Sequence, residues 1–327
     1  MRGTYGPDQP YTELAARALQ LWAKYERRWK RRFLHRSGVL WMAAAPDDRF
    51  ERESIEMLRA AGIEYQELSA ARMRKRWPQI NFEGIEWGIL EPQCGYLDAR
   101  NSCRAVVEAF VAAGGQYLRA AVSPEGIESA PLRRMNMSDG SRLQADIYVF
   151  ACGPWLGGLF PQAIGKLVQA TKQDVLFFGT PAGDSRFSDS QMPVWGDRRD
   201  HFFYGIPGSD RRGFKIADDT RGPDFDPTSG ERIVDSGILE GVRDYIAFRF
   251  PALKDAPLIE TRVCQYEQTP DSHFVIDRHP MNENAWLVGG GSGHGFKHGP
   301  AVGEMMAELI LKDREPAAIW RLGRFQK

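Results

Sequence analysis

A glycine-rich stretch between a short apolar run and a helical pattern is the part of this sequence best suited to bind a ligand. Trp286–Val288 is apolar and predicts a buried strand, and four glycines occur within the next five residues, Gly289 to Gly293. Pro300 suits the first turn of the helix predicted after them. Glycine lets the backbone approach a ligand closely, and a helix start carries unpaired N–H groups and partial positive charge. The stretch therefore predicts a cradle for an anionic or electron-rich group.

The other reactive side chains exclude several kinds of site. The four cysteines, Cys94, Cys103, Cys152 and Cys264, have neither paired nor CxxC spacing, so we expect no disulfide framework and no metal site. The 43 basic and 43 acidic residues give a net charge of zero, and no nucleic-acid partner is expected. The densest basic run, over 24–36, is interleaved with aromatic residues and is typical of the solvated side of a packed helix.

Length and hydropathy limit the class of protein. A chain of 327 residues exceeds the usual size of one hydrophobic core, so we expect two interleaved domains. No signal peptide and no apolar run long enough to span a bilayer are visible in the sequence. We therefore expect a soluble, cytoplasmic protein with no membrane partner.

Helices and strands that position the glycine stretch can be read from the apolar spacing. Helices are predicted over 12–32 and 51–61, and a third begins at Asp98 or Asn101 and ends at Gly114. Strands are predicted over 39–42, 88–90, 117–122 and 147–151. The last of these is nearly all apolar, as expected of a strand buried on both faces, and it ends at a second glycine turn, Cys152-Gly153.

The middle of the chain has a different pattern. Between Val168 and Ala217, short aromatic-rich strands separated by turn residues are typical of an antiparallel sheet; they lie at 175–178, 194–195, 202–206 and 214–216. A helix that carries Ile233, Leu239, Val242 and Ile246 and ends before Pro251 is predicted next, and strands at 260–266 and 273–276 lead back to the glycine stretch. The fold class predicted is α/β (α+β): one α/β layer built from discontinuous pieces, with an antiparallel β-rich insert.

The usual dinucleotide fingerprint is absent. A dinucleotide-binding fold normally opens with a strand, G-x-G-x-x-G, a helix, and a second strand that ends in an acidic residue for the ribose. No glycines have that spacing anywhere in this sequence. Either the chain does not bind a dinucleotide, or its first βαβ unit is missing.

Three segments together resemble the amino-acid-oxidising flavoproteins. They are the glycine stretch with Phe296-Lys297, Val263–Tyr266 followed by Thr269–Asp277, and Gly213–Lys215. The resemblance is to the glycine/D-amino-acid oxidase family, nearest its monomeric sarcosine oxidase / N-methyltryptophan oxidase branch. In that family an Arg-x-x-Tyr-Gly like Arg2–Gly6 follows the first βαβ unit, so the chain resembles a member lacking that unit of ~30 residues or more. The fold implied is a Rossmann-like FAD-binding layer, N-terminally truncated, plus a discontinuous antiparallel β-rich substrate domain.

The resemblance implies FAD-dependent oxidation of the C–N bond of a secondary amine or amino acid. Imine hydrolysis follows, and reoxidation by O₂ gives H₂O₂. The flavin carries the redox chemistry, while the protein supplies orientation and charge. The partners implied are FAD, a small-molecule amine or amino acid, and O₂, with the protein acting as a monomer.

Several residues match positions that contact the cofactor in this family. Cys264 matches a cysteine bonded covalently to the flavin ring; a buried small hydrophobe is the alternative. Val122 and Gly153 match the adenine end. Backbone N–H groups of the glycine stretch are suited to stabilise the negative charge of reduced flavin, and a tight packing turn is the alternative. The residues concerned are Gly291, Gly293, His294, Gly295, Phe296 and Lys297.

Five side chains match catalytic or substrate-binding positions. Lys215 matches a lysine beneath the flavin that assists oxygen activation through its fixed positive charge; an outward-pointing lysine is the alternative. Arg2 and Lys297 match the two cations that hold the substrate carboxylate. Tyr204 and Tyr266 match pocket-lining tyrosines, with core packing as the alternative. His294 is expected to contribute through its backbone rather than as a base.

One position departs from the sarcosine branch, which has a histidine four residues after the lysine where this chain has Asp219. With Asp218 beside it, this favours a substrate with a basic group, or a larger secondary amine, over sarcosine. The resemblance also divides the chain into an incomplete FAD-binding domain (1–36, 92–172 and 262–327) and a substrate domain (37–91 and 173–261).

Two other functions stay open at this point. The same fold can serve a D-amino-acid/glycine-type dehydrogenase with an acceptor other than oxygen. Because the pyrophosphate loop is absent from the sequence, the chain can also be an inactive truncated fragment or an interaction protein unable to hold FAD.

Overall fold

The computed structural model describes residues 1–44, 47–199, 201–208 and 212–326. The chain folds into two compact units, the first made of residues 1–105, 173–220 and 232–264 and the second of residues 106–172, 221–231 and 265–327. Three elements continue from one unit into the other: α4 (Ala99–Ala112), β9 (Gln169–Phe178) and β13 (Leu258–Gln268). The expected division into an FAD-binding and a substrate domain stays a prediction, because compactness does not say which residues hold a cofactor.

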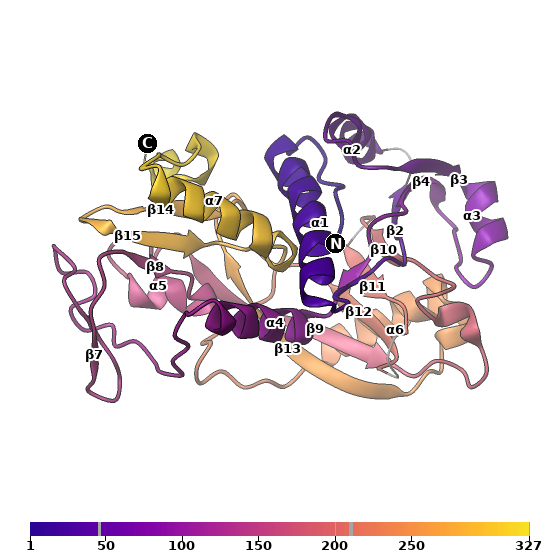
Figure 1. The fold of residues 1–327 in the computed structure, drawn as a ribbon. Helices are drawn as coiled ribbons and strands as arrows, with labels where there is room; N and C mark the ends of the chain where they lie inside the picture. Colours follow the sequence, from indigo (N-terminus) through magenta and orange to yellow (C-terminus); the bar gives the residue numbers. More distant parts are fainter. Residues whose placement is uncertain (45–46, 200, 209–211, 327) are drawn as a thin grey trace. The chain divides into compact units, whose positions relative to one another are not determined.

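An eight-stranded mixed sheet organises the first unit (Figure 1). Its strand order is β13-β9-β12-β11-β10-β2-β4-β3. Strands β9, β12, β11 and β10 pair antiparallel, as the aromatic-rich pattern predicts, and β10 then pairs with β2 in parallel. The remaining strands of this sheet are β2 (Val39–Ala44), β3 (Gln66–Ser69), β4 (Ile85–Glu91), β10 (Val194–Asp197), β11 (Phe203–Ile206) and β12 (Phe214–Asp218). A separate two-stranded sheet joins β1 (Leu34–His35) to β5 (Tyr96–Leu97).

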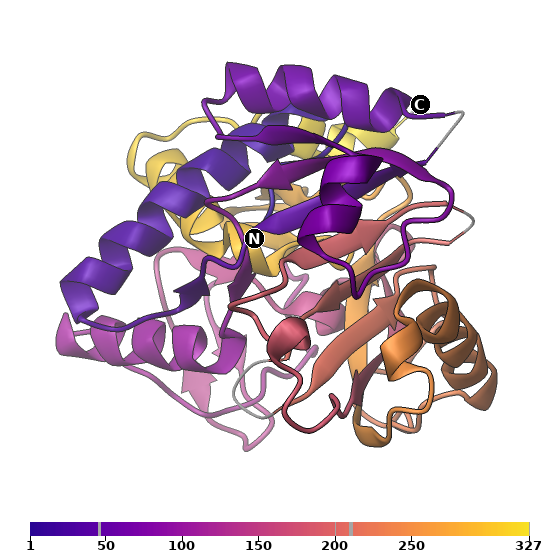
Figure 2. The ribbon, with the colours of Figure 1, turned by 90° about the vertical axis from the view of Figure 1, so that its right-hand side faces the viewer.

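Helices cover the two faces of this sheet. Figure 2 shows α2 (Arg49–Ala60) and α6 (Ser236–Arg249) on opposite sides of it. Apolar side chains that alternate along each strand pack under one helix or the other, Phe214 under α6 and Trp41 under α2. This alternation decides which strand residues share a face. The other helices of the unit are α1 (Gln9–Trp29) and α3 (Ala70–Arg76).

The N-terminal helix forms where the apolar spacing predicts one. Leu14, Ala18 and Leu21 recur at helical spacing in α1 and are buried. The helix ends at Lys30, which takes a left-handed backbone conformation with φ 52°. The predicted helix over 12–32 is therefore confirmed, with both ends shifted three residues toward the N-terminus.

A three-stranded sheet organises the second unit. β14 (Val275–His279) pairs antiparallel with β15 (Asn282–Gly289), and β15 pairs in parallel with β8 (Tyr148–Phe150). Figure 1 shows α7 (Gly299–Leu311) alongside β14 and β15. The predicted strand, glycine turn and helix are thus confirmed, with Pro300 in the first turn of α7. The smaller elements are α5 (Leu156–Leu159), β6 (Met135–Asn136) and β7 (Arg142–Leu143).

One strand predicted in the second unit is absent, and another, present as β8, differs from the prediction in its burial. Residues 117–122 form no strand apart from an isolated bridge between Val122 and Met137. The strand over 147–151 is buried on one face only, because Ile147 and Val149 are 46% and 45% exposed. Among the described residues, β8 is an edge strand of its sheet, and the end of the first segment is hydrogen-bonded to residues 136–138 instead.

Candidate functional site

Three of the predicted site residues share one face of the large sheet. Lys215 on β12 is half-buried, and its Nζ lies 5.2 Å from the centre of the Tyr204 ring on β11. Tyr204 and Cys264 both pack against Val175, Phe177 and Ala217 on this side. Because β12 alternates, Phe214 and Ile216 point to the other side, into the α6 core. The face of the sheet that carries Lys215, Tyr204 and Cys264 is called the Lys215 face below.

An aromatic stripe continues along the Lys215 face toward Arg2. The rings of Tyr204 and Phe202 are 6.0 Å apart, and those of Phe202 and Trp41 are 5.2 Å apart. The Arg2 guanidinium lies 4.9 Å from the Trp41 ring and 4.2 Å from the Tyr5 ring. Two of the predicted cations, Lys215 and Arg2, therefore stand at the two ends of a row of aromatic side chains, a lining that can hold the apolar part of a substrate.

A buried carboxylate fixes the segment that carries Arg2. Glu91, at the end of β4, is fully buried and accepts hydrogen bonds from the backbone N–H groups of Gly3 and Thr4. Arg2 itself donates to the carbonyl oxygen of Thr4. Our reading of the sequence missed Glu91, although an acidic residue directly after the apolar run Gly88–Leu90 was a visible signal.

Two charged groups stand beside the stripe at its Trp41 end. The indole N–H of Trp41 donates to Oε1 of Glu51 at 2.9 Å, and Glu51 is 5% exposed. Burial raises the pKa of the Glu51 carboxyl, and the nearby Arg198 guanidinium opposes that rise. Arg198 lies over the Phe50 ring, and burial lowers its pKa. These side chains were not predicted as site residues because nothing local in the sequence marks them.

The glycine turn of the second unit is shaped largely by internal packing. At Gly293, φ is +82° and a Cβ would stand 2.1 Å from the Tyr266 ring. At Gly290, φ is +71° and a Cβ would stand 2.7 Å from the Thr269 side chain. The turn and the end of β13 therefore fit each other closely, and the Tyr266 ring lies against the turn. Packing explains these two glycines without a ligand.

Glu267 extends from β13 into the start of the same turn. Its carboxyl accepts hydrogen bonds from the backbone N–H groups of Gly291 and Gly290, while burial raises its pKa. Oε2 is buried and has no hydrogen-bond partner among the described residues. Part of the N–H array that was predicted to face a cofactor, including that of Gly291, is thus directed to an internal carboxyl. Glu267 was not predicted as a site residue.

Two further predicted residues in this turn make local contacts. Lys297 is half-buried, and its Nζ donates to the carbonyl oxygen of His294 at 2.9 Å. The His294 ring stacks on Phe274 at 5.2 Å, and its Nε2 lies 3.2 Å from the carbonyl oxygen of Ser272. Gly295 lies against Gly291, and Phe296 begins a single 3₁₀ turn over Phe296–His298. The role of the His294 backbone stays a prediction.

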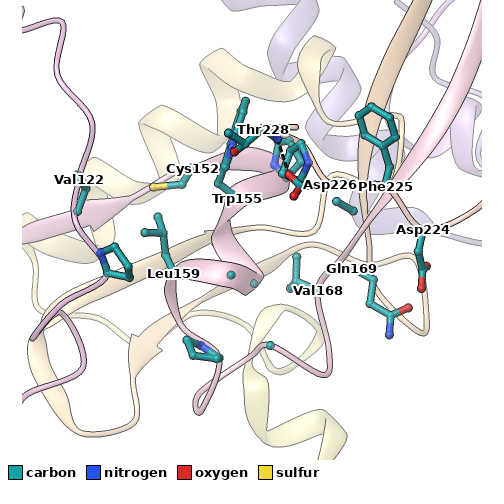
Figure 3. A pocket seen from close by; sticks show the side chains of 18 of the residues that line it. Val122, Cys152, Trp155, Leu159, Val168, Gln169, Asp224, Phe225, Asp226 and Thr228 are labelled. Carbon is teal, nitrogen blue, oxygen red and sulfur yellow. Dashed lines mark hydrogen bonds between the residues drawn. The ribbon is translucent and has the colours of Figure 1, made fainter. Parts of the chain in front are cut away.

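The second unit contains an open pocket at the end of β8 (Figure 3). Its volume is about 1190 Å³, and Val122, Cys152, Trp155 and Thr228 are among the residues that line it. The Trp155 indole donates to Oγ1 of Thr228 at 2.8 Å, which connects two walls of the pocket. Of the two residues predicted at the adenine end, Val122 lines this pocket, and Gly153 stands between two lining residues, Cys152 and Pro154.

The backbone next to this pocket is open at Gly153. Gly153 has φ +55°, and no atom lies within 4 Å of the place where its Cβ would stand. Unlike Gly290 and Gly293, it is not held against another part of the chain, so the space beside it is open. Ligand pockets for small molecules are usually about 300–1,000 Å³. At about 1190 Å³ this pocket is large enough for a small-molecule ligand, and part of an FAD molecule would fit into it.

The cysteines differ in their surroundings. Burial raises the pKa of Cys94, Cys103 and Cys152, and the charge of Glu267 raises that of Cys152 further. None of these three is therefore an activated thiolate. Cys264 stands apart because it lies on the Lys215 face.

The two aspartates after Lys215 have different partners. Asp218 lies 2.8 Å from Nδ1 of His201 and accepts hydrogen bonds from Thr220, so its charge is held locally. The N–H of Asp219 donates to the carbonyl oxygen of Phe202. Asp219 follows directly after the end of β12, two residues beyond Ala217.

Comparison with known protein families places residues 1–309 in the family described as FAD dependent oxidoreductase. The chain belongs to this family. It is 27% identical to the monomeric sarcosine oxidase of a Bacillus species, over 99% of this chain and 84% of that protein. It is 24% identical to the N-methyl-L-tryptophan oxidase of Salmonella arizonae, over all of this chain and 87% of that protein.

The fold is also that of solved members of the family. The L-proline dehydrogenase of P. horikoshii superimposes with a TM-score of 0.85 at 21% identity, covering all of this chain and 86% of that one. These matches confirm the family resemblance, the mixed α/β fold class and the FAD cofactor that the C-terminal motifs imply. Among the described residues, no group of side chains is arranged to hold a metal ion, and no helix is long and apolar enough to cross a membrane.

Proposed function

We propose that the chain oxidises the C–N bond of a secondary amine or N-alkylated amino acid with FAD and passes the electrons to O₂, giving an imine and H₂O₂. The imine then hydrolyses in water. The observation that carries this proposal is the Lys215 face, where a half-buried lysine, a tyrosine and Cys264 lie together. Membership of an FAD-dependent family and similarity to the two amine oxidases support it.

Bound FAD accepts the electrons of the C–N bond; the chain's own groups orient the reactants and supply charge. Lys215 stabilises the negative charge that develops on oxygen, because a fixed ammonium needs no reorganisation during the reaction. Cys264 would hold the flavin ring through a covalent bond. The backbone of the glycine turn from Gly291 to Lys297 would hold the pyrimidine end, and the pocket lined by Val122 and Cys152 would hold the adenine end.

The substrate carboxylate is held by Arg2 and Lys297 in this proposal. A forked guanidinium and an ammonium fix the carboxylate and so orient the C–N bond. Tyr204 and Tyr266 line the substrate pocket. The row Tyr204, Phe202 and Trp41 supports a substrate larger than sarcosine. Asp219, at the place of a histidine in the sarcosine branch, favours a basic group on that substrate.

A dehydrogenase that uses another electron acceptor is the second candidate. The fold likeness to L-proline dehydrogenase favours keeping it. The oxidase and the dehydrogenase proposals differ in what they expect of Lys215, which has a role only when oxygen is the electron acceptor. Action as a monomer and location in the cytoplasm stay predictions.

Peroxide formation by the purified chain tests the proposal. The chain is incubated with FAD, and a panel of N-methyl and D-amino acids is screened under air for one H₂O₂ per substrate consumed. Lys215→Met should lower oxygen reduction by at least tenfold while substrate still bleaches the flavin under nitrogen. Lys172→Met, on β9 of the same sheet, is the matched control and should retain oxygen reduction.

Three results identify the alternatives. Bleaching by substrate without peroxide, restored to turnover by an artificial acceptor, favours the dehydrogenase. Equal oxygen reduction by Lys215→Met and wild type contradicts the role of Lys215. A protein that stays colourless after incubation with FAD contradicts the enzyme proposal. The alternative that remains is an interaction protein unable to hold FAD.

A further inference from the structure

The strongest unassigned cluster in the first unit surrounds Glu91. Its Oε2 accepts from the Gly3 N–H at 2.6 Å and lies 3.1 Å from Sγ of Cys94. Its Oε1 accepts from the N–H of Thr4 at 3.2 Å and from Oγ1 of Thr4 at 2.6 Å. All four donors are neutral, and the Glu91 side chain is 0% exposed. A buried carboxylate with this many short hydrogen bonds is strongly held, because hydrogen bonds to a charged group are about twice as strong as neutral ones.

The residue before these donors is Arg2, which has no acidic partner. Its guanidinium donates to the Thr4 carbonyl oxygen and lies over the Tyr5 and Trp41 rings. Among the described residues, no carboxylate forms an ion pair with it. The positive charge of Arg2 therefore remains available to an anionic ligand. An ion pair between Glu91 and Arg2 would have removed it.

We propose that Glu91 is a positioning residue that holds the segment Gly3-Thr4 so that Arg2 presents its guanidinium to the substrate carboxylate. This inference rests on the proposed function, in which Arg2 binds that carboxylate. Glu91 acts through the backbone of the two residues that follow Arg2 and does not touch the substrate. The ring contacts of Arg2 then fix the direction of the guanidinium along the Lys215 face.

Only a carboxylate satisfies these donors. A glutamine at position 91 keeps one acceptor oxygen, and its amide nitrogen must face either the Gly3 N–H or the Thr4 donors. A donor placed against a buried donor loses the hydrogen bond and leaves both groups unsatisfied. Glu91→Gln should therefore displace the segment at Gly3 or Thr4 with almost no change in side-chain volume.

Asp197 offers a matched control in the same unit. It is also buried, at 1% exposure, and its Oδ2 accepts from Nη2 of Arg249 at 2.7 Å and from the hydroxyl of Tyr245 at 2.8 Å. These partners belong to the α6 side of the sheet, away from Arg2. Asp197→Asn thus also perturbs a buried carboxylate, without a connection to the Arg2 segment.

The experiment compares both variants in the FAD-loaded enzyme. KM and kcat are measured for an N-methyl amino acid and for the corresponding N-methyl amine that lacks the carboxylate. We expect Glu91→Gln to raise KM for the amino acid by about tenfold or more and to leave KM of the amine unchanged. Asp197→Asn should lower the melting temperature but leave the ratio of the two KM values as in wild type.

A second readout does not depend on turnover. The rate at which phenylglyoxal modifies Arg2 is followed by peptide mass, and it should rise in Glu91→Gln and not in Asp197→Asn. If Glu91→Gln does not fold, Thr4→Val is used instead, because it removes the one hydroxyl donor to Glu91. It should raise KM for the amino acid and the rate of Arg2 modification in the same direction, but by less.

Equal KM ratios and equal Arg2 modification rates in the two carboxylate variants would overturn the inference and leave Glu91 as a core residue. Failure of the proposed function is distinct. In that case wild type itself oxidises neither substrate, while the modification rates still decide whether Glu91 positions Arg2.

Discussion

Replacing Gly293 by alanine should disrupt the contact between the glycine turn and β13. The backbone at Gly293 has φ +82°, and a Cβ there would stand 2.1 Å from Cε2 of Tyr266. A left-handed conformation costs an L-residue roughly 1–2 kcal/mol. Inserting a methyl group into a filled space costs roughly 1–3 kcal/mol more. The sum is about 2–5 kcal/mol, unless Tyr266 moves aside.

Gly299→Ala is the matched control for this change. Gly299 begins α7, its φ is −43°, and no atom lies within 4 Å of its Cβ position. An alanine there should be neutral or stabilising by up to ~1 kcal/mol, since alanine favours a helix over glycine. The two variants add the same methyl group six residues apart.

Urea unfolding and FAD titration measure the two consequences. We expect Gly293→Ala to lower the free energy of unfolding by about 2–5 kcal/mol. If Tyr266 moves aside instead, we expect FAD binding to weaken by about tenfold or more. Gly299→Ala should match wild type in both assays. Identical stability and FAD affinity in the two variants would refute the conclusion that the turn is packed against Tyr266.

Three further changes test other parts of the site. Acid precipitation should release the flavin from Cys264→Ala and leave it bound in Cys152→Ala; release from both or from neither contradicts a bond at Cys264. Burial raises the pKa of Glu267 above its ordinary 4.5. Above pH 4.5 the folded chain therefore binds more protons than the unfolded chain. As a result, the free energy of unfolding falls as the pH rises through the folded pKa. Glu267→Gln should make the free energy of unfolding fall less with pH than in wild type. Urea titrations below pH 4.5 and at neutral pH measure this difference, and an equal fall in both proteins would contradict the prediction. Asp219→His should raise kcat/KM for sarcosine relative to an N-methylated basic amino acid, and an unchanged ratio would show that Asp219 does not select the substrate.

Local patterns predicted the parts of the fold that depend on neighbours in the chain. The strand, glycine turn and helix over 286–311 follow from residue types within a few positions of each other, and the structure has them as β15, the turn and α7. The aromatic-rich strands of the sheet were recognised for the same reason. Lys215 and Tyr204 then share a face because an antiparallel pair sets Tyr204 opposite Ala217.

Features that depend on residues far apart in the chain could not be predicted from the sequence. Glu91 lies 88 positions from Gly3, so no local pattern connects its carboxylate to the Arg2 segment. Trp41 was predicted only as part of a strand, although its ring joins the stripe that leads to Arg2. Residues 117–122 have the composition of a strand, but in the described chain only Val122 forms a bridge, to Met137.

A crystal structure of the chain with bound FAD tests the central claim most directly. We predict that the isoalloxazine ring lies against the Lys215 face, with Cys264 in bonding distance of the ring and the Lys215 amine directed at it. A ring bound elsewhere, with the Lys215 face covered by protein or open to water, would contradict the assignment of this face to amine oxidation.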